Sequence, residues 1–263
     1  MIKIISLKDK NSSVQIEKGE LVSFIVDGIE YMHQKGSKGW RKTDDEMFPI
    51  IGTLSKNNFR LTTKQGTAIL DQHGLLREME YVLLSSDKNT AVFSKTYAKN
   101  TPLQNAKFPE KSSEEFVFWP FDFTFEKHFT LKDRILTINF KITSAVGMPF
   151  MLGYHPAFLL SNTGKETLVA NGEKITLAVI YKAGHNAFPI LNTSKIRLEN
   201  MDRNALEIST TNFNNFMLWT PVDNMLCIEP ISQYTSYTDQ NFSEDNMSIS
   251  SGTETFNFEI KVV

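Results

Sequence analysis

Hydrophobic and polar residues alternate along much of the chain. The pattern is clearest in residues 121–131 and 136–143, where apolar and polar side chains exchange at every step. A period of two places successive side chains on opposite faces of a strand, so each run predicts a strand with one buried face. The short segment "KDR" between the runs favours an antiparallel hairpin, and residues 255–263 repeat the alternation near the end of the chain.

Further short strand candidates follow one another along the chain, separated by Gly, Asn, Asp and Pro. They lie near residues 2–7, 14–17, 21–26, 59–63, 80–85, 90–97, 148–154, 174–180, 195–198, 205–210, 215–219 and 225–229. No window of twelve or more residues has a helical stripe. This pattern predicts an all-β sandwich or barrel with few or no long helices, formed by residues 1–263 as a single domain. The longest polar interruption, residues 98–115, is a mobile loop or a lid.

The composition fits an ordinary globular protein. The chain has 263 residues and a formal net charge of −2, with both signs interspersed, so neither nucleic acid nor a membrane surface is an expected partner. The first residues lack the apolar core of a signal peptide, and no run approaches the roughly 20 apolar residues of a membrane helix. The single cysteine, Cys227, excludes an internal disulfide and fits a reducing compartment. We therefore expect a soluble, cytoplasmic protein.

One histidine lies where an apolar run meets a proline. In "FMLGYHPAF", residues 150–158, Pro156 has no N–H for a sheet ladder and favours extended geometry at His155. We expect His155 at a strand terminus, where its side chain can point into a cleft. A structural histidine fits this position as well.

Glu229 occupies a similar position in "NMLCIEPIS", directly before Pro230. It shares a strand face with Cys227, and a carboxylate on an apolar strand is costly unless it is paired or faces a pocket. Cys227 itself fits a small buried hydrophobe better than a nucleophile. No histidine or cysteine spacing indicates a zinc site.

A third segment, "DQHGLLRE", places His73 before a glycine and Arg77 four residues after it. The glycine permits a positive φ or close backbone approach, so the two side chains could converge on a ligand from a bend. A turn with a histidine bonded to the backbone is the alternative.

Four segments occur in an order that resembles the aldose 1-epimerase, or galactose mutarotase-like, superfamily and particularly its LacX-like branch. They are "MFPIIGTL" (47–54), "QHGLLRE" (72–78), "GYHPAF" (153–158) and "CIEP" (227–230). The strand "FWPFDFTFEKHFTL" resembles a further family segment. The ordered set spans residues 47–230, and the flanking strands fit the same fold.

The resemblance implies a large twisted antiparallel β-sandwich, the galactose mutarotase-like supersandwich, in agreement with the alternation. By this resemblance His155 corresponds to the family's general acid and Glu229 to its general base. His73 corresponds to a histidine that contacts the sugar, and Arg77 to an arginine that relatives use for the phosphate of phosphorylated sugars. The expected activity is that of an isomerase, which interconverts the α and β anomers of a hexose or hexose phosphate.

Anomer exchange through ring opening needs a proton at the ring oxygen while another leaves the C1 hydroxyl. A carboxylate with a reference pKa of about 4.3 is basic at neutral pH, and an imidazole near about 6.5 can be held protonated by negative charge. Each group contributes roughly 10²–10⁴-fold if well placed. No metal, cofactor or covalent intermediate is required. The expected partner is a small-molecule sugar or sugar phosphate, and the chain is expected to be a monomer or homodimer.

Two positions depart from the family pattern. Family members commonly carry an arginine where this chain has Thr53, and Lys56 is our candidate for its replacement, beside Arg60 and Arg41. The family often has an aspartate where this chain has His185 or Asn186, so we include His185 in the predicted site.

Three aromatic residues could form an apolar platform for a sugar ring. Trp40, in a polar loop, is the better candidate for ligand contact, whereas core packing fits Trp119 and Phe158. Two other functions stay open. One is a catalytically silent carbohydrate-binding sandwich, and the other is a glycoside hydrolase or lyase with a second carboxylate at roughly 5–5.5 or 6.5–9.5 Å from Glu229.

Overall fold

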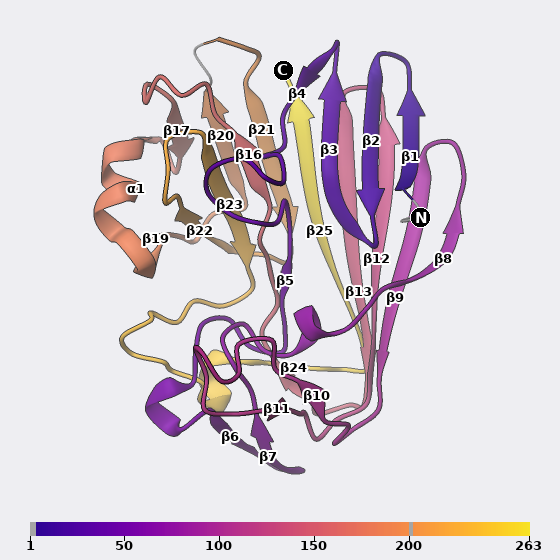
Figure 1. The fold of residues 1–263 in the computed structure, drawn as a ribbon, viewed down its shortest axis with the longest axis vertical. Helices are drawn as coiled ribbons and strands as arrows, with labels where there is room; N and C mark the ends of the chain where they lie inside the picture. The colour runs from indigo at the N-terminus through magenta and orange to yellow at the C-terminus, as the bar shows by residue number, and fades with distance from the viewer. Residues whose placement is uncertain (1–3, 200–201) are drawn as a thin grey trace.

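β-Strands dominate the protein, which was analysed as a computed structural model that describes residues 4–199 and 202–263 (Figure 1). The largest element is a nine-stranded antiparallel sheet that contains the longest strands of the chain. Its strands are, in spatial order, β18 (Glu173–Thr176), β17 (Thr167–Ala170), β20 (Lys195–Glu199), β21 (Leu206–Thr211), β25 (Thr253–Val262), β13 (Ile135–Ser144), β12 (Phe123–Lys132), β9 (Thr90–Tyr97) and β8 (Val82–Ser86). The all-β prediction is confirmed.

A second sheet carries the segments singled out by the proline-terminated runs. Its strands are, in spatial order, β19 (Phe188–Leu191), β22 (Asn215–Trp219), β23 (Met225–Ile231), β15 (Gly153–Tyr154) and β5 (Glu46–Met47), with β16 (Ala157–Leu159) also paired to β23. Tyr154 joins this sheet to the larger one, because its ring centroid lies 5.0 Å from that of Phe140 and 5.1 Å from that of Phe258. The core therefore lies between the two sheets, as in a sandwich.

Smaller sheets complete the fold. A four-stranded meander at the N-terminal end lies beside the long strands in Figure 1 and consists of β1 (Ile4–Asp9), β2 (Ser12–Glu17), β3 (Glu20–Val26) and β4 (Ile29–Glu30). Three two-stranded sheets pair β6 (Arg60–Thr63) with β7 (Gly66–Ile69), β10 (Leu103–Gln104) with β11 (Phe116–Val117), and β14 (Pro149–Phe150) with β24 (Ser248–Ile249).

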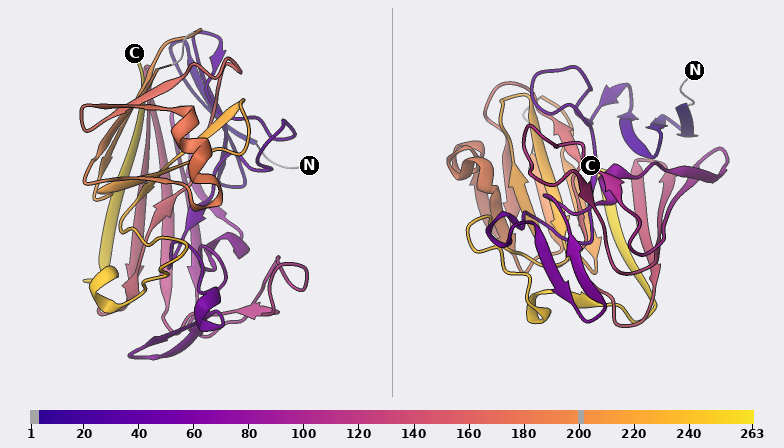
Figure 2. Two further views of the ribbon diagram at one scale, coloured as in Figure 1. Left: turned by 90° about the vertical axis from the view of Figure 1, so that its left-hand side faces the viewer. Right: turned by 60° about the horizontal axis from the view of Figure 1, so that its bottom comes forward.

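Helical structure is scarce among the described residues. The α-helix α1 (Leu177–Ala183) lies at the outer side of the molecule (Figure 2), and four 3₁₀ turns accompany it: η1 (Ser55–Asn57), η2 (Leu76–Glu78), η3 (Gly184–Asn186) and η4 (Glu244–Asn246). The predicted strand over 174–180 is therefore wrong beyond Thr176. Leu177 and Ile180, three residues apart, are the buried residues of α1, so a helical face covers this part of the core. In the part of the chain described, no helix combines the length and apolar character that crossing a membrane requires.

The predicted hairpin is confirmed. β12 pairs antiparallel with β13 in a register that sets Phe125 opposite Ile142 and Phe129 opposite Ile138. Both strands alternate buried and less buried residues along their length. The apolar positions of the two runs thus form one continuous core face, as a period of two requires.

Candidate active site

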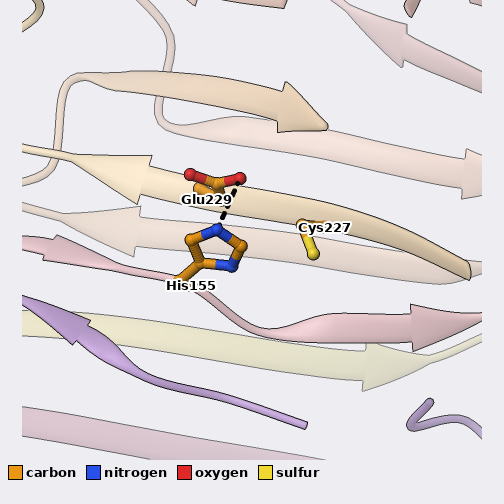
Figure 3. A group of neighbouring side chains, drawn as sticks. All are labelled: His155, Cys227 and Glu229. Atoms are coloured by element: carbon orange, nitrogen blue, oxygen red, sulfur yellow. Dashed lines mark ion pairs between the residues drawn. The ribbon is translucent and has the colours of Figure 1, made fainter. Parts of the chain in front are cut away.

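The register of the smaller sheet brings His155 and Glu229 together. Gly153 is paired with Ile231 and Ala157 with Cys227, so the position opposite Glu229 in this antiparallel arrangement is His155. Directly opposite residues lie on the same face of a sheet. His155 Nε2 accordingly lies 3.3 Å from Glu229 Oε1 (Figure 3).

Strand alternation decides which way these side chains point. Tyr154 is buried in the core between the sheets, so the following residue, His155, faces the opposite side. His155 lies directly after β15, as predicted. Glu229 does not end its strand, because β23 continues through Pro230 to Ile231. A proline removes only one donor, and the neighbouring chain is itself interrupted there, between β15 and β16.

Both side chains line one cavity of about 620 Å³, within the range of about 300–1,000 Å³ that is typical of small-molecule sites. Its floor is the outer face of the smaller sheet, and its rim comes from loops distant in sequence. The lining includes Trp40, Ile51, Gly52, Gln72, His73, Arg77, Lys111, His155, His185, Asn186, Ala187, Met217, Trp219, Glu229, Thr235 and Tyr237.

Two tryptophans flank the histidine. The Trp40 ring centroid lies 4.4 Å from that of His155, and the Trp219 centroid lies 6.0 Å from it. The Trp40 loop is held close to the sheet by Gly39, which has a φ of 119° and where an added Cβ would lie 2.5 Å from the sulfur of Met225. Because of this packing, the half-buried Trp40 side chain lies against the His155 ring at the cavity.

A tight turn presents His73 to the same cavity. His73 has a φ of 68°, and its backbone N–H donates to the Gly52 carbonyl over 2.7 Å. The next residue, Gly74, has a φ of 79°, and an added Cβ would lie 2.1 Å from the Phe48 carbonyl oxygen. The expected close backbone approach is therefore present. The His73 and His155 ring centroids lie 6.3 Å apart.

Arg77 lies at the boundary between this cavity and a smaller one of about 260 Å³. Arg77 Nε lies 3.3 Å from Asp45 Oδ2, and Lys42 Nζ lies 2.7 Å from the same oxygen. Burial alone would raise the pKa of Asp45, but the charges of Arg77 and Lys42 outweigh it and keep this pKa below its usual value. The Asp45 carbonyl also accepts the backbone N–H of His155 over 2.8 Å, so Asp45 connects Arg77 with the His155 segment.

Burial changes the protonation of the central pair. It raises the pKa of Glu229 to about 8 and lowers the pKa of His155 to about 3, because both charged forms lose contact with water. The positive charge of Arg77 lowers the pKa of His155 further and opposes the rise for Glu229. Near neutral pH the ligand-free pair thus carries one proton, on the carboxyl group. The expectation of a charged carboxylate beside a protonated imidazole is wrong for this state.

The structure brings most of the predicted site residues together. His155, Glu229, His73, Arg77 and Trp40 all line the cavity. His185 lines it as well, from the exposed turn η3.

Lys56 is the predicted residue that does not line the cavity. It is exposed on η1, where its ammonium group donates to the Thr238 carbonyl and its backbone N–H donates to Gln240. Thr53, which takes the place of the family arginine, is buried and accepts the backbone N–H of Ser55. Neither residue supplies a cation to the cavity. Trp119 and Phe158 are buried in the core, as expected.

Several lining residues have no signal in the sequence. Lys111 belongs to the polar interruption 98–115, and Lys107 of the same segment binds Asp71 Oδ1 and Gln72 Oε1, each over 3.0 Å. Part of this segment therefore packs against the site. Trp219 ends a predicted strand opposite Cys227, and only the pairing of β22 with β23 places it on the cavity floor.

Comparison with known proteins agrees with this fold. Residues 52–179 match the aldose 1-epimerase family. The chromosomal and plasmid forms of protein LacX from Lactococcus lactis subsp. lactis are each 26% identical over 164 residues, which cover 59% of this chain and 50% of theirs. The matched segment thus spans about half the length of these curated relatives.

Solved structures cover the described fold more fully. A galactose mutarotase related enzyme from Lactobacillus acidophilus has a TM-score of 0.77 at 19% identity, covering 99% of this chain and 97% of its own. A galactose mutarotase-like protein from Lactobacillus casei has a TM-score of 0.80 at 18% identity, covering 99% of this chain and 100% of its own. The fold is that of the galactose mutarotase-like sandwiches. The chain therefore has the galactose mutarotase-like fold, with a segment that matches the aldose 1-epimerase family and a segment similar to LacX, in agreement with the resemblance seen in the sequence.

Proposed function

We propose that the protein interconverts the α and β anomers of a hexose or hexose phosphate, with His155 and Glu229 as one acid–base pair. The observation that carries the proposal is their contact of 3.3 Å at the floor of a cavity of about 620 Å³. A catalytic acid and base must both reach the sugar, and these two groups share one face of one sheet.

Ring opening moves one proton onto the pair and another away from it. With Glu229 as the base, the carboxylate takes the C1 hydroxyl proton while His155 protonates the ring oxygen. Rotation about the C1–C2 bond and ring closure then reverse both transfers. The pair thus alternates between two arrangements of a single proton.

The ligand-free pair, with its proton on the carboxyl group, corresponds to the arrangement that follows ring opening. A bound cyclic sugar must therefore draw that proton onto the imidazole. Hydroxyl groups that donate to a carboxylate stabilise its charged form, so the sugar's own hydroxyls favour this shift. The buried pair consequently becomes competent for ring opening when the sugar binds.

The charges around the cavity suit a sugar with an anionic group. Arg77 and Lys111 line it, whereas Glu229 supplies the only carboxyl group among the described lining residues. A glycoside hydrolase needs a second carboxylate, and the described residues that line the cavity do not supply one. A silent sugar-binding sandwich is the remaining alternative, because neither Thr53 nor Lys56 supplies the cation of the missing family arginine.

The test is anomer exchange followed by polarimetry or NMR over a panel of free and phosphorylated hexoses. Glu229→Gln should lower the rate roughly 10²–10⁴-fold with a melting temperature at neutral pH no lower than that of the wild type. Glu207→Gln, at an exposed position of β21, is the matched control and should keep the wild-type rate. Sugar binding without faster anomer exchange in the wild type would instead support the silent binder.

A further inference from the structure

Cys227 adjoins the acid–base pair on the same strand face. It precedes Glu229 by two residues on β23, so both side chains point toward the cavity side of the sheet. The ligand atoms offered by His155, Cys227 and Glu229 all lie within 4.8 Å of one another (Figure 3). Two segments that are far apart in sequence thus bring three metal-ligating groups together, and no spacing motif in the sequence indicates this cluster.

None of the three groups is fully satisfied within the described residues. Cys227 is a free, buried thiol. Nδ1 of His155 is buried without a hydrogen-bond partner. Glu229 is only 2% exposed, and its carboxylate lies 3.3 Å from His155, a residue that would bind the same cation. Buried polar groups ordinarily have partners, so this cluster has unused capacity to bind.

The donor set matches a known metal preference. Thiolate, imidazole and carboxylate bind Zn²⁺ at about 2.3, 2.0–2.1 and 2.0–2.2 Å, in tetrahedral geometry. Those lengths separate neighbouring donor atoms by roughly 3.3–3.7 Å. The distance of 3.3 Å between His155 Nε2 and Glu229 Oε1 already has this length, and the Cys227 sulfur, within 4.8 Å of the other ligand atoms, would have to move closer to them. Three protein ligands leave a fourth position for water.

We propose that His155, Cys227 and Glu229 form a binding site for a thiophilic divalent cation such as Zn²⁺, and that the bound cation blocks anomer exchange. On binding, the thiol and carboxyl protons leave to solvent while three metal–ligand bonds form. The cation then occupies both members of the acid–base pair. Binding itself is independent of the proposed function, and only the inhibition rests on it.

Co²⁺ is the spectroscopic probe, added to the full chain after removal of metals with a chelator. Cys227 is the only cysteine, so any thiolate-to-cobalt charge-transfer absorption comes from it. We expect this absorption in the wild type, its loss on addition of Zn²⁺, and its absence in Cys227→Ala. Loss of an outer-sphere partner weakens metal binding about 10–100-fold, so loss of the thiolate should weaken Zn²⁺ binding in calorimetry roughly 100-fold or more.

Enzyme assays test the second half of the proposal. Without metal, Cys227→Ala should exchange anomers at the wild-type rate, because the fully buried Cys227 thiol does not line the cavity and takes no part in proton transfer. A Zn²⁺ concentration that stops the wild type should leave this variant active. Cys227→Ser, with melting temperatures for all proteins, checks that the result does not come from misfolding.

The proposed metal site would be wrong if the wild type with Co²⁺ showed no charge-transfer absorption. It would also be wrong if the wild type and Cys227→Ala bound Zn²⁺ with the same affinity. The cobalt titration of the wild type decides this even if neither variant folds. Metal binding in a protein that exchanges no anomers after chelation would support the site and count against the proposed function alone.

Discussion

The backbone N–H of Gly52 donates to Nδ1 of His73 over 3.1 Å. An amide N–H can only donate, so Nδ1 must accept, and the neutral ring carries its proton on Nε2. Burial, with the charge of Arg77, lowers the pKa of His73 well below its usual value, which keeps the ring neutral at physiological pH. His73 Nε2 lies 3.2 Å from the side-chain amide of Gln72, which also lines the cavity, so the Nε2–H group is the one hydrogen-bond donor that the His73 ring can offer a ligand.

Removing that donor should weaken sugar binding. Asparagine tolerates the positive φ of His73 but is too short to reach into the cavity. One lost hydrogen bond costs about 0.5–1.5 kcal/mol, so His73→Asn should raise KM about tenfold at most and lower kcat less. His128→Asn, on β12 and paired with Glu126, should leave KM unchanged. A KM in His73→Asn equal to that of the wild type would rule out a role in binding.

The pair should set the pH profile of anomer exchange. Its single proton is retained between about pH 3, where His155 becomes protonated, and about pH 8, where Glu229 loses its proton. Because kcat/KM reports the free enzyme, it should be level from mildly acidic to neutral pH and fall above about 8. Polarimetry after subtraction of the buffer rate checks this. A profile that instead falls on acidification near pH 6.5 would show an unperturbed imidazole.

Stability should depend on pH for the same reason. The pKa of Glu229 is raised from 4.5 to about 8, so the folded state holds a proton that the unfolded state has lost, and stability falls as pH rises between these values. The pKa of His155 is lowered from 6.5 to about 3, so stability falls as pH drops between those values. Considering this pair alone, stability is greatest between about pH 4.5 and 6.5.

Glu229→Gln removes the alkaline loss, since its amide never ionises. The melting temperature of the variant minus that of the wild type should therefore be larger above pH 8 than near pH 5. Thermal unfolding across this range measures the effect. Equal differences at both pH values would mean that Glu229 titrates with an ordinary pKa.

The turn that presents His73 should tolerate no side chain at Gly74. Gly74 and Gly172 have nearly the same φ, 79° and 77°, but a Cβ on Gly172 meets nothing within 4 Å. Gly172→Ala should cost about 1–2 kcal/mol for the left-handed conformation alone. Gly74→Ala should cost clearly more, because the clash is with the Phe48 backbone. Denaturant unfolding of both variants compares them, and equal losses would show that the turn can relax.

Much of the fold follows from the chain itself. The hairpin of β12 and β13 was predictable because a strand with one buried face needs only alternation, which is local. The helix α1 was not, because "TLAVIYKA" has the β-branched residues of a strand and only its packing against β22 and the neighbouring strands selects the helix. The buried Lys127 is a second case. Its Nζ lies 2.7 Å from both Asp44 Oδ2 and Glu46 Oε1, partners that no local pattern identifies.

The residue types of the candidate site could also be identified in the sequence. Proline and glycine mark where His155 and His73 leave regular structure, and Glu229 is a carboxylate on an otherwise apolar strand. Their meeting was decided by the tertiary structure, because strand register joins residues that alternation can only assign to a face. Burial likewise belongs to the assembled fold, and desolvation, not residue type, determines that the proton of the ligand-free pair lies on Glu229.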